Sequence, residues 1–313
     1  MTAFAFVFPG QGSQSVGMLS AWGDHPAVRA TLEEASAALG EDVARLIAEG
    51  PKEALDLTTN TQPVMLTAGI ACYRAWIAET GLTPAAVAGH SLGEYSALVA
   101  AGALSLSDAL PLVRFRAQAM QEAVPVGVGA MAAILGLDAE AVREGCRQAA
   151  AAAPGEVVEA VNFNDPKQTV IAGSKAGVDK GCELLKALGA KRALQLPVSA
   201  PFHSSLMKPA AERLRERLAS VTLAAPTIPV VNNIDVAVVS DAEAIRDALY
   251  RQAFGPVRWV EVVQALKARG LTHVIECGPG KVLAGMAKRI DAELISAPLF
   301  DPASLAEVKA LLA

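Results

Sequence analysis

The sequence predicts an α/β protein: a parallel sheet with helices on both faces, interrupted by a smaller ferredoxin-like unit. Two observations lead to this prediction. Over residues 1–124, short apolar strands alternate with longer helical patterns, which is typical of a parallel sheet. From about residue 126 the expected order becomes β-α-β-β-α-β, the order of a ferredoxin-like unit, and the earlier alternation resumes after residue 200.

The first part of the chain begins with an expected strand. The apolar runs AFAFVF (3–8) and AAVAG (85–89) have the length of buried strands. Residues 60–80 have the length and composition of a helix, with Asn60 as its expected cap. Ser107 and Asp108 are expected to cap another helix, which runs to about residue 123.

The inserted unit and the segment after it complete the predicted fold. Within the unit we expect strands at 127–137, 156–163, 168–173 and 190–198, and helices at 138–153 and 174–189. After it we expect strands at 229–233 and 272–278, and helices at 204–219, 241–253, 257–269 and 279–290. Residues 1–125 and 201–313 would then form a large domain, residues 126–200 a small one, and the cleft between them would be the ligand site.

The composition fits a folded globular chain and disfavours several classes of protein. The 313 residues are 52% hydrophobic and 19% charged, and the formal net charge of −5 disfavours broad nucleic-acid binding. The four cysteines, at positions 72, 146, 182 and 277, form no CxxC pair and no Cys/His cluster, which disfavours a zinc site. Their wide spacing fits a reducing cytosol better than a disulfide framework. We expect Cys277 to be a buried structural thiol. The N-terminus lacks the basic segment of a targeting signal and no apolar stretch is long enough for a bilayer, so a cytoplasmic protein without membrane contact is expected.

Residues 89–93, GHSLG, connect the strand at 85–89 to the helical pattern LGEYSALVAAGAL. In this setting G-x-S-x-G is typical of a nucleophile elbow, which would make the large domain α/β-hydrolase-like and project Ser91 from the sheet. Gly89 and Gly93 would remove Cβ atoms where the turn crowds its neighbours. The helix N-terminus would direct free N–H groups toward an oxyanion formed there. A chance pentapeptide in an ordinary turn is the alternative.

A serine nucleophile needs a base, and the sequence contains four histidines. His90 is adjacent to the serine, and neighbouring side chains diverge on such a turn. His25 lies in a polar loop that we expect to be solvated, and His273 lies within a strand, where a packing role is expected. His203 lies where the small domain returns to the large one and is the candidate base, with a helix cap or a surface position as the alternative. No carboxylate stands out as the third group, but a backbone carbonyl can also accept the Nδ1–H bond.

Longer motifs extend over most of the chain. They are FPGQGSQ (8–14), TQP (61–63), GHSLGEYSAL (89–98), RAQAMQ (116–121), GAMAAILGL (129–137), VNFNDPKQTVIAG (161–173), APFHSSLMKPA (200–210), PVVNN (229–233), RQAFGPVRW (251–259) and ECGPGKVL (276–283). This set resembles the malonyl-CoA:acyl carrier protein transacylases, the acyltransferases of type II fatty acid synthesis. The inserted ferredoxin-like domain also belongs to that family.

The resemblance implies roles for individual residues. Ser91 would be the nucleophile and His203 the general base, oriented by the main-chain carbonyl of Gln252. The backbone N–H groups of Gln11 and Leu92 would form the oxyanion hole.

The resemblance also implies a carboxylate clamp. Arg116 matches the arginine that holds the malonyl carboxylate in two charge-assisted hydrogen bonds, which a neutral acetyl group cannot use. A surface arginine like its neighbour Arg114 is the alternative. Phe202 resembles the bulky residue that favours malonyl over branched groups. The other implied pocket residues are Met120, Gln62 and Asn162, for which core packing or bridging of the backbone is the alternative.

The implied reaction moves a malonyl group from malonyl-CoA to the phosphopantetheine thiol of acyl carrier protein through a malonyl-serine intermediate. It requires no metal or redox cofactor, and the family resemblance suggests a monomer. Because carrier protein is acidic, we expect a local basic patch near the cleft mouth. The candidates are Lys191, Arg192, Lys288 and Arg289, for which solvated helix or strand ends are the alternative.

Other functions stay open at this stage. A serine ester or thioester hydrolase would use the same elbow and base with water as acceptor, although a malonate clamp would be unusual in such an enzyme. A non-catalytic carrier-binding module is a further alternative. Within the transferases, the chain could serve fatty acid synthesis, a polyketide pathway or malonate decarboxylase, and its short length without fused domains favours fatty acid synthesis.

Overall fold

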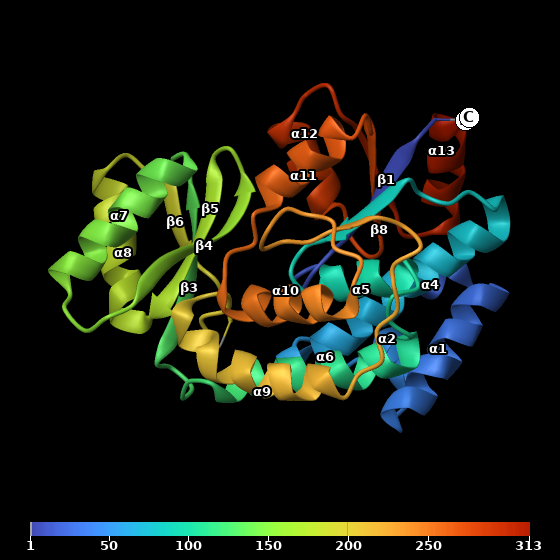
Figure 1. Cartoon of the computed structure of the whole chain (residues 1–313), viewed down its shortest axis with the longest axis horizontal. Helices are drawn as coiled ribbons and strands as arrows, with labels where there is room; N and C mark the ends of the chain where they lie inside the picture. The colour runs from blue at the N-terminus through green and yellow to red at the C-terminus, as the bar shows by residue number, and fades with distance from the viewer. Residues whose placement is uncertain (1, 199) are drawn as a thin grey trace.

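A sheet of parallel strands, in the order β7-β2-β1-β8-β9, forms the centre of the fold, and an antiparallel sheet in the order β4-β5-β3-β6 lies beside it (Figure 1). This computed structural model describes residues 2–198 and 200–313; Met1 and Ser199, which the predicted domain ranges include, lie outside the described residues. The strands are β1 (Phe4–Phe8), β2 (Ala86–Gly89), β3 (Gly129–Leu135), β4 (Val158–Asp165), β5 (Gln168–Ser174), β6 (Arg192–Gln195), β7 (Val230–Val231), β8 (His273–Cys277) and β9 (Ile295–Leu299). The helices are α1 (Pro26–Leu39), α2 (Val43–Glu49), α3 (Lys52–Leu55), α4 (Thr58–Thr80), α5 (Gly93–Ala100), α6 (Leu106–Glu122), α7 (Ala139–Ala152), α8 (Lys175–Ala187), α9 (Lys208–Ala219), α10 (Ala242–Phe254), α11 (Trp259–Ala268), α12 (Val282–Ile290) and α13 (Pro302–Leu312), with short 3₁₀ turns at Ser20–Trp22 and Ser205–Met207.

Strand β1 is buried at every residue because helices cover both faces of the parallel sheet. Its phenylalanines face α4, where the Phe6 ring meets Trp76 edge-on at 5.6 Å. Ala5 and Val7 point to the opposite face and belong to the apolar cluster formed with α11 and α12. This arrangement confirms the predicted α/β class.

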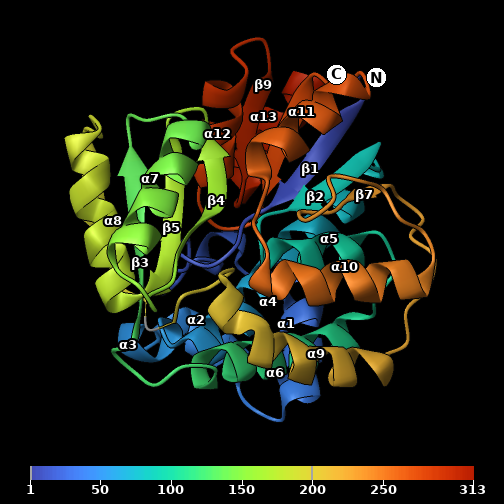
Figure 2. The same ribbon diagram turned by 60° about the vertical axis from the view of Figure 1, so that its left-hand side comes forward.

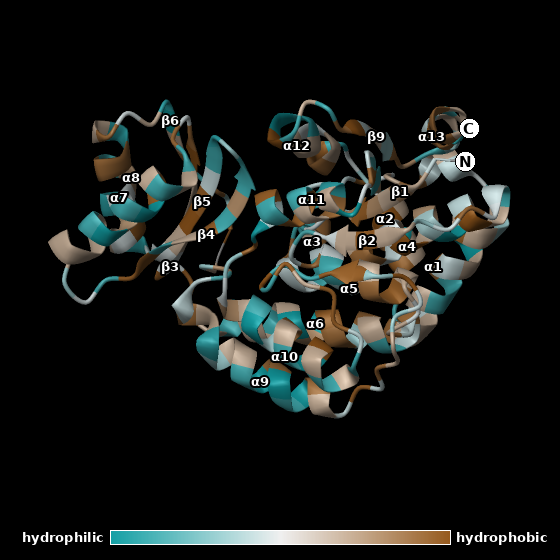
Figure 3. Ribbon diagram, turned by 45° about the horizontal axis from the view of Figure 1, so that its top comes forward, coloured by the Kyte–Doolittle hydropathy of each residue, from teal (hydrophilic) through white to brown (hydrophobic). Residues whose placement is uncertain are grey.

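Helix α5, which follows β2 directly, is apolar on nearly all sides and lies in the interior. It is largely brown in Figure 3, whereas the outer helix α9 carries its charged face in teal. The chain ends meet beside this core, since the Thr2 N–H donates to the Leu312 carbonyl at 3.3 Å and Figure 2 shows the two termini side by side.

Residues between β3 and β6 form the expected β-α-β-β-α-β unit, coloured green at the left of Figure 1. Helices α7 and α8 cover one face of its antiparallel sheet through a cluster that includes Val142, Ile171 and Leu185. The opposite face carries Met131 and Val170 and packs against the segment that returns to the parallel sheet. The sheet order and the connections confirm the ferredoxin-like prediction.

The structure corrects two of the predicted helix caps. Helix α4 begins at Thr58, so Asn60 lies in its first turn, where its amide donates to the Ala54 carbonyl and ties the helix to α3. Helix α6 is capped by Ser105, whose hydroxyl accepts the Asp108 N–H at 3.0 Å, and not by Ser107. The spacing of three residues between cap and accepted N–H is the usual one.

Candidate active site

Ser91 lies in a sharp turn between β2 and α5 that has no room for side chains at its flanking glycines. Its φ of 53° is in the left-handed region, which residues with a Cβ rarely adopt. A Cβ on Gly89 would lie 1.9 Å from the carbonyl carbon of Gly93, and one on Gly93 would lie 2.1 Å from the Phe8 oxygen. The Ser91 N–H donates to Asn233 Oδ1 at 2.7 Å, which helps to hold the strained backbone.

Ser91, His203 and Gln252 form a hydrogen-bonded chain. His203 Nε2 lies 2.7 Å from Ser91 Oγ, and His203 Nδ1 lies 2.9 Å from the Gln252 carbonyl oxygen. Because that carbonyl can only accept, Nδ1 carries the hydrogen and Nε2 accepts from the serine hydroxyl. Burial, together with the nearby Arg116 guanidinium, lowers the pKa of His203 to about 3, so the imidazole is in the neutral form that a base requires.

Arg116 extends from α6 to the same serine and is only 2% exposed. Its Nη1 donates to Gln62 Oε1 at 2.8 Å, and its Nη2 donates to Ser91 Oγ at 3.2 Å and to Gln252 Oε1 at 3.1 Å. Its Nε has no hydrogen-bond partner among the described residues. By contrast, Arg114 on the same helix pairs with Glu41 near the surface. Arg116 therefore presents a buried positive charge whose contacts are neutral oxygens, a setting suited to an incoming carboxylate.

These side chains line a cavity of about 200 Å³. The predicted residues on its wall are Gln11, Gln62, Ser91, Leu92, Arg116, Met120, Asn162, Phe202 and His203. Gln252 stands behind this wall and reaches the site through its carbonyl and its side-chain amide. The sheet of the inserted unit contributes Met131 and Val170.

Leu92 belongs to the serine turn and Gln11 to the loop after β1, and both line the cavity. Leu92 precedes α5, where the first amides of a helix lack intrahelical acceptors. Gln11 follows β1, and Gly10 brings this loop close, since a Cβ there would lie 2.6 Å from the His90 carbonyl oxygen. Asn162 is only 6% exposed, and its Oδ1 has no hydrogen-bond partner among the described residues.

Several residues of the site were not predicted. His90 Nε2 lies 2.8 Å from Asn164 Oδ1 on the cavity wall, and burial lowers the pKa of His90. Asn164 could have been found from strand alternation, because residues two apart on β4 share a face with Asn162. Glu94 and Asn233 lie beneath the serine turn, where Asn233 contacts both Ser91 and Glu94; the motifs that contain them, 89–98 and 229–233, indicate no role for either residue.

The other two histidines and the cysteines lie outside the cavity. His25 is not solvated as expected: it precedes α1, its ring packs edge-on to Trp22 and its Nε2 lies 3.2 Å from Glu79. His273 lies within β8, with Nδ1 3.0 Å from the Thr272 hydroxyl. All four cysteines are free and buried, as expected for Cys277.

The described residues contain no group of three or more His, Cys, Asp or Glu side chains able to hold a metal ion. No helix within residues 2–198 and 200–313 combines the length and the apolar character needed to cross a bilayer.

The four basic docking candidates are exposed but differ in surroundings. Lys191 and Arg192 stand at the start of β6, whereas the residues that follow this strand, Leu196 and Val198, line the cavity. Arg289, near the end of α12, donates through Nε to the buried Asp165 at 2.7 Å and so ties α12 to β4.

Comparison with known proteins assigns the chain to a family of acyl transferases. Residues 5–293 match the model of the acyl transferase domain. The chain is 54% identical to the malonyl CoA-acyl carrier protein transacylase of Salmonella typhimurium, covering 97% of this chain and 98% of the relative, and 46% identical to that of Bacillus subtilis, covering 97% and 96%.

Solved structures give the same result. An acyl-carrier-protein S-malonyltransferase from Burkholderia pseudomallei is 69% identical with a TM-score of 0.96, covering 98% of this chain and 99% of that one. A malonyl-transacylase solved in complex with a type II PKS acyl-carrier protein is 48% identical with a TM-score of 0.95, covering 97% and 98%. The chain therefore belongs to the acyl transferase family, among the malonyl CoA-acyl carrier protein transacylases.

Proposed function

We propose that this chain transfers a malonyl group from malonyl-CoA to the phosphopantetheine thiol of an acyl carrier protein and so supplies fatty acid synthesis. The observation that carries the proposal is the buried Arg116 guanidinium, 3.2 Å from the hydroxyl of Ser91. A nucleophile beside an unpaired buried cation selects an acyl group that carries its own carboxylate. The names of the relatives, which share up to 54% identity among the curated proteins cited above, support the same substrate.

In the first half-reaction, Ser91 Oγ attacks the thioester carbonyl carbon while its proton moves to His203 Nε2. The Gln252 carbonyl accepts the Nδ1–H bond and stabilises the imidazolium that forms. The N–H groups of Leu92 and Gln11 would bind the oxyanion. Collapse of the tetrahedral intermediate breaks the C–S bond, and the CoA sulfur leaves with the proton from His203.

In the second half-reaction, the phosphopantetheine thiol gives its proton to His203 and attacks the carbonyl carbon of the malonyl ester. The C–O bond to Ser91 then breaks, and the serine oxygen takes the proton back. These steps use only groups of the chain and its two substrates, so we propose that no cofactor takes part.

The malonyl group would occupy the cavity between the sheets. We propose that Arg116 and Gln62 bind the carboxylate end, and that Met120 and Phe202 limit the space around the central carbon. Asn162 would offer its unpaired oxygen to an N–H of the arriving thioester or thiol arm.

A transfer assay tests the proposed function. The enzyme, malonyl-CoA and holo-acyl carrier protein are mixed, and the carrier is followed by mass spectrometry beside free CoA. We expect malonyl-carrier to form at the rate at which CoA is released. Release of CoA at the same rate without carrier would favour the hydrolase instead.

A polyketide carrier is the second candidate acceptor, because the relative of 48% identity was solved with such a carrier. Competition between a fatty acid carrier and a type II polyketide carrier in the same assay decides between them. A higher kcat/KM for the polyketide carrier would reassign the pathway.

We propose that the carrier docks on exposed basic residues, with Lys191 and Arg192 as the first pair to test and Lys288 and Arg289 as the second. The first pair gives the cleaner test, because Arg289 also pairs with Asp165. Replacement of both first-pair residues by Glu should raise the KM for carrier and leave malonyl loading unchanged. An unchanged KM for carrier would contradict this docking site.

We also propose that residues 1–125 with 201–313 and residues 126–200 are separate domains, and that the protein acts as a cytoplasmic monomer. The separate apolar clusters of the two sheets support the division. Light scattering during gel filtration measures the oligomeric state, and a dimer would contradict the proposal.

A further inference from the structure

Glu94 is a buried carboxylate in the first turn of α5, three residues after the serine, and the proposed mechanism does not use it. Glu94 is only 2% exposed. Its Oε2 accepts the Asn233 N–H at 2.8 Å and the Gln252 side-chain Nε2 at 3.0 Å. A carboxylate is costly to bury, so its retention beneath the site calls for a function.

The side chain of Gln252 has only one orientation that satisfies its neighbours. Its Nε2 donates to Glu94 Oε2 and to the Ser91 carbonyl oxygen, each at 3.0 Å. Its Oε1 accepts from Arg116 Nη2 at 3.1 Å. If the amide were turned over, its oxygen would face two acceptors and its nitrogen would face a guanidinium, which only donates.

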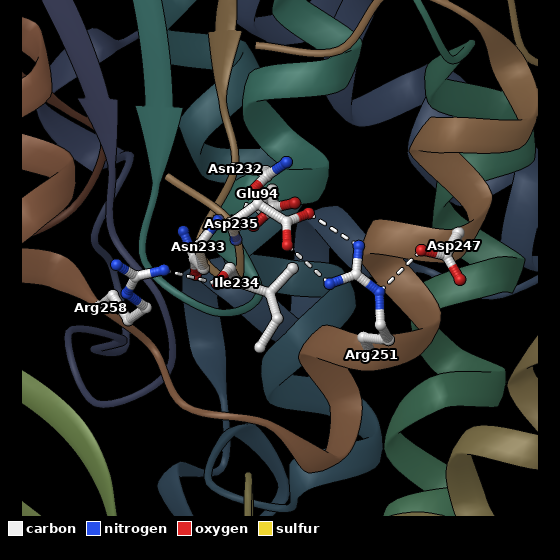
Figure 4. A network of polar contacts seen from close by, with 8 residues as sticks. All are labelled: Glu94, Asn232, Asn233, Ile234, Asp235, Asp247, Arg251 and Arg258. Carbon is white, nitrogen blue, oxygen red and sulfur yellow. Dashed lines mark hydrogen bonds and ion pairs between the residues drawn. The ribbon is translucent and has the colours of Figure 1, made fainter. Parts of the chain in front are cut away.

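The carboxylate itself is held by the loop after β7. Figure 4 shows Glu94 next to Asn232, Asn233 and Asp235, and Arg251 reaching from α10 to Asp235. That contact is bidentate, with both N–O distances at 2.7 Å. The loop therefore fixes the Asn233 N–H, and with it one oxygen of Glu94.

The placement puts one amide between the Arg116 guanidinium and the Glu94 carboxyl group, whose pKa burial raises to about 7. Gln252 lies between Glu94 and Arg116, so the carboxylate polarises the amide without occupying the face of the guanidinium that an acyl carboxylate needs. A direct ion pair would neutralise Arg116 and compete with the substrate.

We propose that Glu94 is a positioning residue for substrate selection: it fixes the Gln252 amide so that the amide oxygen orients Arg116 toward the carboxylate of the acyl group. The inference rests on the proposed function, in which Arg116 binds that carboxylate. Glu94 contributes through Gln252 and touches neither the substrate nor the reacting atoms.

Glu94→Gln tests this inference, because a glutamine can also donate to Gln252 and so permits the turned amide. Rates of acyl-enzyme formation are measured with malonyl-CoA and with acetyl-CoA, beside the melting temperature. We expect the malonyl-to-acetyl ratio of kcat/KM to fall at least about 10-fold, the equivalent of ~1.4 kcal/mol, with acetyl loading nearly unchanged. Glu276→Gln, a change at a buried carboxylate of β8 outside the cavity, is the matched control and should keep the wild-type ratio.

Gln252→Met provides the second variant, because it removes the side-chain amide and keeps the backbone carbonyl that holds His203. It should lower the same ratio, and adding Glu94→Gln to it should lower the ratio no further. An unchanged ratio in both single variants, an equal loss with both thioesters, or additive losses in the double variant would overturn the inference. If Glu94→Gln does not fold, an unchanged ratio in Gln252→Met still overturns the inference, because Glu94 acts only through the Gln252 amide. A wild-type enzyme that forms no malonyl adduct would instead refute the proposed function.

Discussion

Removal of the Arg116 side chain should convert a malonyl-selective site into an unselective one. In Arg116→Ala, the bound carboxylate would lose two charge-assisted hydrogen bonds and would stay in a cavity that is partly closed to water. At ~1.5–3 kcal/mol for each of the two bonds, the loss is about 3–6 kcal/mol, or roughly 10²- to 10⁴-fold in kcat/KM for malonyl-CoA. Acetyl-CoA has no carboxylate, so its kcat/KM should change by less than about 10-fold, an allowance for the lost contact to Ser91 Oγ.

Rapid-quench measurement of acyl-enzyme formation with each thioester is the assay. Arg114→Ala is the matched control, since Arg114 lies two residues away on α6 and pairs with Glu41 instead of lining the cavity. It should leave both rate constants near wild type. Equal losses for malonyl-CoA and acetyl-CoA in Arg116→Ala would refute the reasoning, because they would assign Arg116 to the chemistry or to the fold and not to the carboxylate.

Three further predictions concern pH and packing. Burial and the Arg116 charge lower the pKa of His203 to about 3, so the rate of acetyl-enzyme formation by wild type should be nearly constant from pH 8 to pH 5. Arg116→Ala should move the acid limb of this pH–rate profile to higher pH. A wild-type acid limb near the ordinary histidine pKa of 6.5 would contradict this prediction. Burial raises the pKa of Glu276 to about 7 from 4.5, so the folded state binds the proton more tightly than the unfolded state and loses stability as pH rises through this interval. Glu276→Gln should therefore stabilise the protein more at pH 8 than at pH 5, by up to roughly 3 kcal/mol in urea unfolding, and equal effects at both pH values would contradict it. Gly93→Ala should lower the melting temperature and abolish acyl-enzyme formation, because the new Cβ would lie 2.1 Å from the Phe8 oxygen. The cost of overpacking, ~1–3 kcal/mol, exceeds the ~1 kcal/mol by which alanine stabilises a helix relative to glycine. A wild-type melting temperature in this variant would refute the prediction.

The part of the site that could be predicted from residues alone is the part formed by neighbours in sequence. The serine turn is such a case, because five consecutive residues determine its geometry and its need for glycine. The contact of Ser91 with His203 joins residues 112 positions apart, and that with the Gln252 amide joins residues 161 positions apart. No rule of sequence spacing connects these residues. His203 is predicted from its place between the two domains, and Gln252 only from the family resemblance.

Long-range partners also explain what was missed. Glu94 and Asn233 were visible in motifs, but their role depends on a hydrogen bond between residues 139 positions apart. Local signals could have found α1, which begins at Pro26 and ends before Gly40 in the left-handed conformation. The edge strand β9 is absent from the predicted strands, because Pro298 within it weakens the sequence pattern of a strand.

The central claim is that Ser91 carries a malonyl group selected through its carboxylate. Intact-mass spectrometry after brief exposure to malonyl-CoA, beside acetyl-CoA, tests it most directly. The account predicts one malonyl adduct on the wild-type chain, none on Ser91→Ala, and little on Arg116→Ala, with a weaker acetyl adduct on wild type. A malonyl adduct that persists in Ser91→Ala, or steady release of CoA without any adduct, would contradict the claim.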